Sequence, residues 1–582
     1  MTASATNSPA PRLADHTADW RMLALAGGAV VIGSGGALGA WVLLKLIAVA
    51  TNVFWFGRLS AAAVQITQSR VGFGILIIPV IGSVIVGLMA RFGSDKIRGH
   101  GIPEAIEAIL YGESRLSLKV AVLKPLSSAI SIGSGGPFGA EGPIIMTGGA
   151  IGSLFAQLFH LSAAERKVLL VSGATAGMTA IFGTPVAAIL LAVEVLLFEW
   201  KPRSFVPVTV AVLASACWRP LLIGVGPLFP FAGDLPHGSA LLPLALGVGI
   251  AVGLLAVVLS ATLYRIEDGF HRLPVHWMWW PALGAVVVGL GGLLDPRVLG
   301  AGYTNIQDLL DGSLTFRLVL VLLVIKAAVW LVALGSGTSG GVLAPLLILG
   351  GALGSLIGSV LPGGSGLWAM VGMAAIMSGA MRAPMTGALF AVELTGHLGA
   401  LPLVMAASAG AYALSVLLMR RSILTEKIAR RGRHIVQEYS VDSHEFLQVS
   451  QIMTPDPATM RGDMPVEQAI AIFAGNASHR SYPVVDAEGH LLGLVSRSDA
   501  LRWQVDGAPP GASLADLLSD AEQPFALPHA PIGEVADLII ETGIGRIPIV
   551  DPVSRRVVGI ASRHDLLKGR RARIEMEQIR SR

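Results

Sequence analysis

The chain has 582 residues, of which 53% are hydrophobic and only 14% are charged, whereas about 25% are charged in a typical soluble domain. This composition excludes a fully soluble protein, and the length predicts more than one domain. The modest net charge of +4 argues against a nucleic-acid surface, and the single cysteine excludes an intrachain disulfide framework and a cysteine-based metal site. We therefore expect an integral membrane protein that carries a soluble part.

The chain begins with a polar, proline-containing segment, residues 1–19, that we expect to be disordered. It has no basic stretch ahead of a short apolar run, so no cleaved signal peptide is predicted and the first membrane segment should target the protein. An almost continuously apolar region follows, from about residue 20 to 430. We interpret it as one polytopic membrane domain made of α-helices.

The apolar region is divided into runs of uneven length. Residues 22–49 and 241–263 are long enough for a spanning helix, which needs about 20 apolar residues. Other runs are shorter and are interrupted by glycine or proline: 119–132, 142–159, 185–198, 342–360 and 384–395. Broken helices at membrane depth occur only where protein or a water-filled cavity surrounds them. We therefore expect roughly sixteen to eighteen helical pieces, several of which do not cross the bilayer fully.

Two pairs of segments reveal an internal repeat. GSGGPFGAEGP (133–143) resembles GSGTSGGVLAP (335–345), and GTPVAAILLAVEV (183–195) resembles MRAPMTGALFAVEL (381–394). Gly133 and Gly335 are 202 residues apart, and the second pair is offset by 199. Two halves with broken segments in matching places are typical of transporters whose binding site lies at the repeat interface near the bilayer midplane. The repeats are predicted at about 20–225 and 235–425.

Basic residues gather in three loops, at 91–98, 199–203 and 419–434. Because loops rich in Lys and Arg remain on the cytoplasmic side of a membrane, these loops should face the cytoplasm. The soluble region that follows the third loop is then cytoplasmic as well. We expect the protein in a bacterial inner membrane.

Three glycine-rich loops each precede an apolar helix: GHGIPE (99–104), GAEGPIIM (139–146) and GGVLAPLLILG (340–350). The first N–H groups of a helix have no internal partner and carry partial positive charge, and glycine lets a ligand approach them closely. Proline near each helix start occupies a favoured first-turn position. If these helix starts converge, they form an anion site without a fixed positive charge. The alternative is that the glycines only allow tight helix packing.

With these motifs the chain resembles the CLC family of chloride channels and chloride/proton exchangers. The family signatures GSGIP, G(K/R)EGP and GxFxP read here as GHGIP, GAEGP and GVLAP, each with one departure. The resemblance implies two inverted-topology repeats with broken helices, and a homodimer in the lipid bilayer with one pathway for chloride or other small anions in each subunit. The anion-binding positions that it implies are Gly99, His100, Gly101, Ile102, Pro103, Gly139, Ala140, Gly142, Pro143, Gly341, Val342, Leu343 and Leu424.

Glu141 corresponds to the glutamate that gates the pathway in this family. A carboxylate mimics chloride, so it can occupy an anion site when charged and leave when it is protonated or displaced, and ionisable groups inside a membrane are functional by default. The alternative is a buried carboxylate fixed by helix N-terminal amides. The backbone N–H groups of Val342 and Leu343 match the family's central anion ligands.

His100 replaces the family's central serine, and Ala140 and Leu343 are the other two departures. A neutral imidazole can donate one hydrogen bond to the anion, as a serine does, and a protonated imidazole would bind more strongly and add pH dependence. Alternatively, His100 points aside and only its backbone participates.

Two further positions bear on passive conduction against exchange. The family's anion-coordinating tyrosine corresponds to Leu424, which cannot donate a hydrogen bond, so the inner gate is expected to be looser or purely apolar. The glutamate that receives protons in exchangers corresponds to Val195, so this proton relay is predicted to be lost. Glu199, one turn further on, could receive protons or be a solvated loop residue. These losses favour a chloride channel, with a proton-coupled anion antiporter as the alternative.

The soluble region contains two related units, 449–503 and 514–570, and each resembles a CBS domain of α/β class. The first contains YPVVD and LLGLVS, and the second contains IPIVD and VVGIAS. In nucleotide-binding CBS pairs a matched serine and aspartate contact phosphate and ribose, which would place an adenine nucleotide at Ser496, Asp499, Ser562 and Asp565. The alternative is a pair that serves only dimerisation and coupling. Residues 571–582 form a charged tail.

Two other classes of function compete with anion transport. GTSGG (337–341) matches the motif of intramembrane serine proteases, with His397 as a partner, but His397 lies in a predicted loop, so no enzyme is expected. A CBS-containing divalent-cation transporter would need several converging carboxylates. Glu141, Glu194 and Glu393 are isolated from one another in sequence, and positive helix ends would repel cations, so no metal site is expected.

Overall fold

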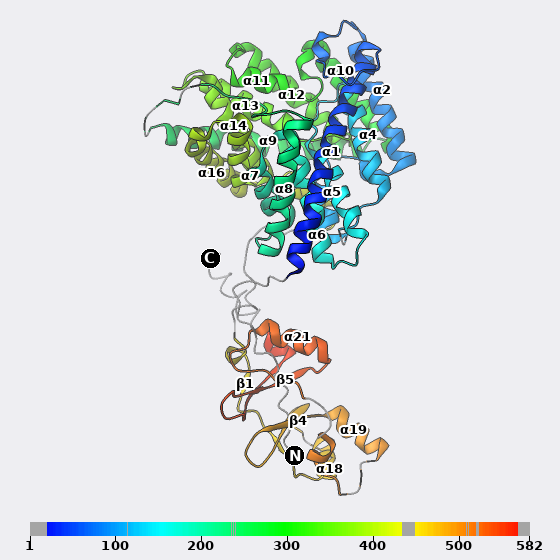
Figure 1. Ribbon diagram of the computed structural model, residues 1–582, viewed down its shortest axis with the longest axis vertical. Coiled ribbons are helices and arrows are strands. Elements are labelled where there is room, and N and C mark those ends of the chain that lie inside the picture. The colour runs from blue at the N-terminus through cyan, green and yellow to red at the C-terminus, as the bar shows by residue number, and fades with distance from the viewer. Residues whose placement is uncertain are drawn as a thin grey trace. The chain divides into compact units, whose positions relative to one another are not determined.

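The computed structural model describes residues 20–433 and 448–567, except 113, 234, 237, 239, 476, 508, 510 and 519–522. The chain divides into two compact units, Met1–Gln437 and Glu438–Arg582 (Figure 1), and each is described by itself. Two predicted segments lie outside the described residues: the disordered segment 1–19 and the charged tail 571–582.

The first unit is built from α-helices of very different lengths. The described part of residues 20–433 contains seventeen of them, which confirms the predicted all-α domain with broken helices. Eight helical segments in this part of the chain are long and apolar enough to cross a membrane. The helices are α1 Arg21–Phe56, α2 Gly74–Leu88, α3 Ile102–Tyr111, α4 Leu118–Gly133, α5 Glu141–Gln157, α6 Ala163–Phe182, α7 Pro185–Leu191, α8 Pro202–Leu222, α9 Leu241–His271, α10 Trp280–Leu294, α11 Tyr303–Leu310, α12 Phe316–Gly335, α13 Leu343–Gly358, α14 Gly364–Met381, α15 Pro384–Thr395, α16 Leu401–Leu418 and α17 Thr425–Arg430.

A left-handed residue followed by a proline sets the break at equivalent places in the two repeats. The C-cap of α6 is Gly183, whose φ of 68° is left-handed, and Pro185 begins α7. In the second repeat the C-cap of α14 is Arg382, with a φ of 59°, and Pro384 begins α15. Proline suits a first turn because the N–H that it lacks would have no partner there. α7 continues into a π-helical turn, η4 (Ala192–Leu197).

The helix crossings repeat as well. α5 packs on α6 in the first repeat, and α13 packs on α14 in the second. At each crossing two glycines face one another: a Cβ on Gly148 would lie 2.2 Å from the carbonyl oxygen of Gly173, and a Cβ on Gly372 would lie 2.2 Å from that of Gly350. These glycines do serve close helix packing. The matching crossings confirm the predicted architecture of two repeats.

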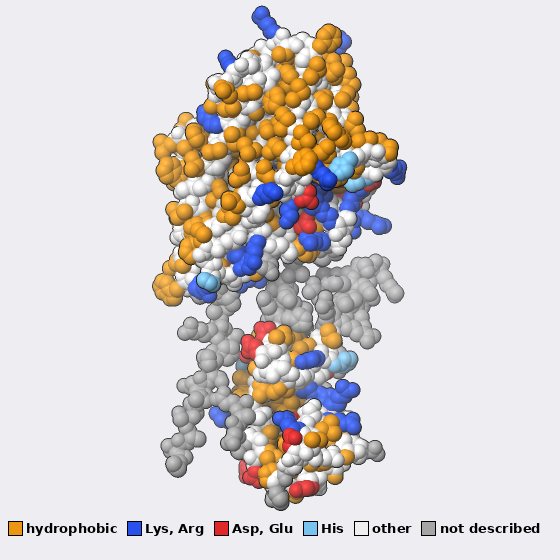
Figure 2. Space-filling view, turned by 90° about the vertical axis from the view of Figure 1, so that its right-hand side faces the viewer, with side chains coloured by type: hydrophobic (Ala, Val, Ile, Leu, Met, Phe, Trp, Pro, Cys, Tyr) orange, Lys and Arg blue, Asp and Glu red, His pale blue; other side chains and the backbone are white. Residues whose placement is uncertain are grey.

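The surface of the helical unit is largely hydrophobic on the face shown in Figure 2. Exposed apolar side chains follow the long helix α9, where Leu246, Ile250, Leu254 and Val258 recur at helical spacing. Soluble proteins rarely expose apolar patches of this size, whereas a lipid-facing surface requires them. The protein is therefore an integral membrane protein, as its composition predicts.

Residues 448–567, as far as the structure describes them, contain two three-stranded sheets, with strand orders β2-β3-β4 and β1-β6-β5. β3 pairs antiparallel with β4, and β5 pairs antiparallel with β6, which confirms the two predicted strand–turn–strand motifs and the α/β class. The elements are β1 Thr454–Pro455, β2 Met460–Arg461, α18 Val466–Ala474, β3 Ser481–Val485, β4 Leu491–Ser496, α19 Arg497–Asp506, α20 Leu514–Leu518, α21 Ile532–Thr542, β5 Arg546–Val550 and β6 Val557–Ser562.

The beginning of each CBS motif packs on the sheet of the other motif. Val449 is buried in the core around Ile547, and β1 pairs with β6. Leu514 is buried in the core around Val484. Each of the two cores is therefore completed by an apolar residue from the other half of the pair.

Candidate anion site

Each of the three glycine-rich loops leads into the start of a helix, two in the first repeat and one in the second. α3 begins at Ile102, α5 at Glu141 and α13 at Leu343. The first N–H groups of these helices have no partner within the helix, and the helix dipole adds partial positive charge at the same end. Glu141 is the first residue of α5, whereas the sequence suggested that it belongs to the loop before the helix.

Backbone hydrogen bonds join the three loops. Gly139 and Gly341, which come from different repeats, each donate an N–H to the other's carbonyl, with N···O distances of 3.2 and 2.9 Å. The Gly340 N–H donates to the Gly99 carbonyl at 3.4 Å. The loops that the sequence singles out therefore meet at the repeat interface.

The glycines of these loops leave no room for a side chain. A Cβ on Gly142 would lie 1.7 Å from the carbonyl oxygen of His100. A Cβ on Gly139 or on Gly341 would lie 1.9 or 2.6 Å from Oε2 of Glu141. The carboxylate of Glu141 thus rests against backbone from both repeats, and this close approach requires glycine.

The carboxylate of Glu141 is fully buried and only partly paired. The side chain has no exposed surface, and its Oε2 has no hydrogen-bond partner among the described residues. Its Oε1 lies 3.4 Å from the hydroxyl of Tyr303, the first residue of α11. An unpaired buried acceptor is costly in a protein, so Oε2 does not stabilise the fold in this arrangement, and the gating role of Glu141 stays a prediction.

His100 is buried beside Glu141's helix, and it is 3% exposed. Its Nδ1 has no hydrogen-bond partner in the part of the chain that the structure describes. The close packing of its carbonyl on Gly142 fixes the backbone. The Nδ1 atom of the imidazole is therefore available to bond a ligand. The role of His100 in anion binding stays a prediction.

Comparison with known proteins identifies the fold that carries this site. The family model described as voltage gated chloride channel matches residues 81–416, which is more than half of the chain, and CBS domain models match 449–506 and 515–571. The chain belongs to the voltage gated chloride channel family. This is the CLC family that the three loop motifs indicate, so the chain is a CLC-family anion transporter followed by two CBS domains.

Relatives with two kinds of name are about equally similar to the chain. The putative chloride channel protein ClcB-like of Ralstonia nicotianae is 28% identical, over 67% of this chain and 92% of the relative. The voltage-gated ClC-type chloride channel ClcB of Salmonella typhimurium is 30% identical, over 61% and 87%. The H(+)/Cl(-) exchange transporter ClcA of Salmonella paratyphi B is 29% identical, over 54% and 71%.

Solved structures share the fold. A slow cyanobacterial Cl-/H+ antiporter matches with a TM-score of 0.61 and 21% identity, over 69% of this chain and 98% of that one. A eukaryotic CLC transporter matches with a TM-score of 0.59 and 20% identity, over 94% and 98%. At these identities the likeness establishes the CLC fold.

The remaining family positions lie in buried surroundings. Leu424 immediately precedes α17 and is 1% exposed. Val195 lies in η4, is 2% exposed, and belongs to a turn that packs against α3 and α6. The other buried positions are Gly99, Gly101, Ile102, Pro103, Ala140, Pro143, Val342 and Leu343.

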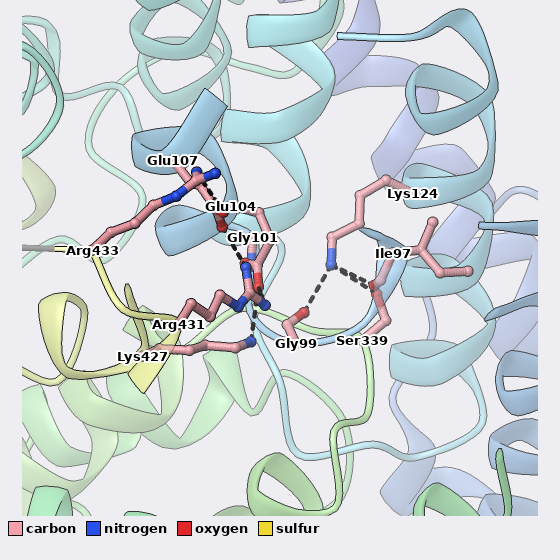
Figure 3. Close-up of polar contacts among 10 residues, drawn as sticks. All are labelled: Ile97, Gly99, Gly101, Glu104, Glu107, Lys124, Ser339, Lys427, Arg431 and Arg433. Carbon is pink, nitrogen blue, oxygen red and sulfur yellow. Dashed lines mark hydrogen bonds and ion pairs between the residues drawn. The ribbon is translucent and has the colours of Figure 1, made fainter. Parts of the chain in front are cut away.

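Lys124 holds two of the loops from behind, and sequence reasoning missed it. Its buried Nζ donates to the carbonyls of Ile97 and Gly99, both at 2.8 Å, and to the Ser339 hydroxyl at 3.1 Å (Figure 3). A buried amine therefore joins the loop before α3 to the segment before α13. Among the described residues, its three hydrogen-bond acceptors are two backbone carbonyls and one hydroxyl.

The second repeat contains the counterpart of this lysine. Lys326 lies 202 residues after Lys124, and its buried Nζ donates to the carbonyls of Val298 and Gly300 at 2.8 and 3.0 Å. The repeat offset, together with a lysine inside an otherwise apolar run, is a signal that could have identified both residues.

An ion-pair cluster ties α3 to the end of the membrane unit. Its members, drawn in Figure 3, are Glu104, Glu107, Lys427, Arg431 and Arg433. Glu104 accepts from the Gly101 N–H at 2.9 Å and from Lys427 Nζ at 2.8 Å. The buried carboxylate of Glu104 therefore connects the start of α3, which borders the candidate site, to α17.

Glu194 and Glu393 cap helices of the opposite repeat. Glu194 accepts from the N–H groups of Met385 and Thr386, at 3.2 and 2.8 Å, at the start of α15. Glu393 accepts from the N–H groups of Val186 and Ala187, at 3.0 and 2.8 Å, at the start of α7. A carboxylate suits a helix start because it satisfies free N–H groups and complements the dipole. These two carboxylates are therefore already used by backbone donors.

Replacing Glu194 with alanine is expected to destabilise the membrane unit. The change leaves the first N–H groups of α15 unpaired, which costs about 2 kcal/mol of the free energy of unfolding, and should lower the midpoint of thermal unfolding in detergent by a few degrees. Glu393→Ala should act alike at α7. Glu194→Gln keeps an acceptor and should lose less; equal losses for alanine and glutamine would contradict the capping role.

The predicted nucleotide positions of the CBS pair form two capping boxes. Ser496 donates its hydroxyl to Asp499 at 2.6 Å at the start of α19, and Ser562 donates to Asp565 at the same distance. The two pairs occupy equivalent places after β4 and β6. Both pairs thus have a structural role, and adenine-nucleotide binding stays a prediction.

The serine of the protease-like motif is engaged elsewhere. The Ser339 hydroxyl lies 3.3 Å from that of Ser127 and 3.1 Å from that of Ser128, besides its bond to Lys124. His397 stacks edge-on against Phe231. The Ser339 hydroxyl therefore serves as an acceptor for Lys124. The family to which the chain belongs consists of channels and transporters.

Proposed function

We propose that this anion transporter is a chloride channel gated by the carboxylate of Glu141. The observation that supports the proposal is the place of that carboxylate: it is fully buried where loops from both repeats meet, with one oxygen unpaired among the described residues. Helix starts at this point favour negative charge. The charged carboxylate occupies the position suited to an anion, and its protonation or displacement opens the pathway.

Two apolar positions support passive conduction over exchange. Val195 and Leu424 are buried and can neither carry a proton nor donate a hydrogen bond. Glu199, the nearest acidic alternative, accepts from the Ser204 hydroxyl at 2.8 Å and lies 3.9 Å from Lys167 Nζ. Its carboxylate is thus already engaged in the loop that joins η4 to α8.

The same proposal covers the assembly. The protein would act as a homodimer in a bacterial inner membrane, with one chloride pathway in each subunit. The basic loops support a cytoplasmic position for the CBS pair, and an adenine nucleotide bound at Ser496, Asp499, Ser562 and Asp565 would regulate the gate.

Vesicle transport tests the proposal. Purified protein is placed in lipid vesicles with a chloride gradient, equal pH on both sides, and a potassium ionophore that clamps the voltage. We expect the chloride gradient to dissipate without net proton movement. Proton transport driven by chloride would contradict the channel and favour the antiporter, and its loss in Glu199→Gln would then identify Glu199 as the proton acceptor.

A further inference from the structure

Tyr303 occupies the second-repeat counterpart of the GHGIP motif. GAGYTN (300–305) follows GHGIPE (99–104) at an offset of 201 residues. The glycines match in conformation: Gly302 has a φ of 71° and Gly101 a φ of 90°. The buried lysines match too, since Lys326 and Lys124 each bond the first glycine carbonyl of its motif. The pseudo-symmetry thus brings a second glycine-rich helix start to Glu141, with a tyrosine as its first residue.

The hydroxyl of Tyr303 lies between a donor and an acceptor of the gate helix. The Ala140 N–H donates to the hydroxyl oxygen at 3.4 Å, and the hydroxyl donates to Oε1 of Glu141 at 3.4 Å. These two directions are the only ones possible, because the backbone amide of Ala140 can only donate and the ionised carboxylate of Glu141 can only accept. Tyr303 therefore contacts both the backbone just before the gate residue and its carboxylate.

The ring of Tyr303 is held in place by an aromatic neighbour. It lies 5.8 Å from the ring of Phe229, at an interplanar angle of 55°. Phe229 is 4% exposed, and its N–H donates to the carbonyl of Leu394 at 3.0 Å. Aromatic pairs of this kind contribute about 0.5–1.5 kcal/mol beyond their buried area. The ring contact thus favours the orientation in which the hydroxyl faces Glu141.

We propose that Tyr303 is a positioning residue that latches the Glu141 carboxylate in the anion site. This inference rests on the proposed gating function and adds a side chain that none of the family motifs contains. A hydrogen bond from a hydroxyl stabilises a charged acceptor more than a neutral one. The latch therefore favours the occupied, closed arrangement, and an entering chloride must displace a carboxylate that Tyr303 retains.

The Tyr303→Phe variant separates the latch from packing, since phenylalanine keeps the ring contact with Phe229. We expect chloride flux from vesicles at neutral pH to rise about two- to tenfold, the range of one hydrogen bond. Chloride binding to the purified protein should tighten by a similar factor because the carboxylate competes less. Tyr412→Phe on α16 is the matched control, and we expect it to leave flux and binding unchanged.

A double variant makes the test specific. In Glu141→Gln, which lacks the charged carboxylate, adding Tyr303→Phe should change neither flux nor chloride binding. Equal effects of Tyr303→Phe in both backgrounds, or no effect in either, would overturn the latch while leaving the gate intact. An unchanged flux in Glu141→Gln alone would overturn the gate and the latch together. Thermal unfolding of each variant shows whether the fold is retained.

Discussion

Chloride flux through the Glu141→Gln variant is expected to be high and independent of pH. In the natural protein the flux should rise as the pH falls, because protonation removes the charge that lets the carboxylate compete with chloride. Glutamine has no charge at any pH, so the variant should behave like the fully protonated protein. We expect an increase of about tenfold at neutral pH, which corresponds to about 1.4 kcal/mol in the free energy with which the carboxylate competes against chloride.

The measurement is chloride efflux from vesicles over a range of pH. Glu165→Gln is the matched control, since Glu165 closes the capping box with Ser162 at the start of α6 and glutamine keeps that bond. A Glu141→Gln variant that retains the pH dependence of the natural protein would remove Glu141 from the gate. A control with altered flux would indicate a general effect of carboxylate loss.

Gly142→Ala is expected to abolish chloride flux and to lower stability strongly. Its Cβ would lie 1.7 Å from the His100 carbonyl oxygen and 3.3 Å from the Gly341 Cα. Backbone atoms cannot move aside by a change of rotamer, so the three loops must separate, at a cost of about 3 kcal/mol or more. Flux and the thermal unfolding midpoint are measured on the same purified sample.

Gly247→Ala provides the control for this substitution. Gly247 lies within α9, and a Cβ there would meet nothing within 4 Å. Alanine is favoured over glycine inside a helix by about 1 kcal/mol, so the unfolding midpoint should stay equal or rise and the flux should not change. If Gly142→Ala behaved like Gly247→Ala, the tight contact between the loops of α3 and α5 would be contradicted.

Much of the fold can be predicted from the sequence because glycine and proline mark the helix breaks. Pro185 and Pro384 begin α7 and α15, as the repeat suggests, and the offset of about 200 residues recurs in the structure. The three glycine-rich loops could be identified as well, because glycine and first-turn proline are local features that can be read directly from the sequence. Their convergence follows from the repeat symmetry.

Contacts between distant segments account for what sequence reasoning missed. Glu194 and Glu393 cap helices in the opposite repeat, and a cap normally lies next to its own helix. Lys124 and Tyr303 belong to no family motif, so only the pairing of the repeats relates them to the loops. In the second unit, the pairing of β1 with β6 joins segments about 100 residues apart.

The reversal potential of the chloride current in a planar bilayer tests passive conduction most directly. With a tenfold chloride gradient and equal pH, a chloride-selective channel reverses at about 59 mV in magnitude. We expect a pH gradient added to the same bilayer to leave this potential unchanged. A reversal potential that moves with the pH gradient would show that protons are coupled to chloride, and would contradict the channel.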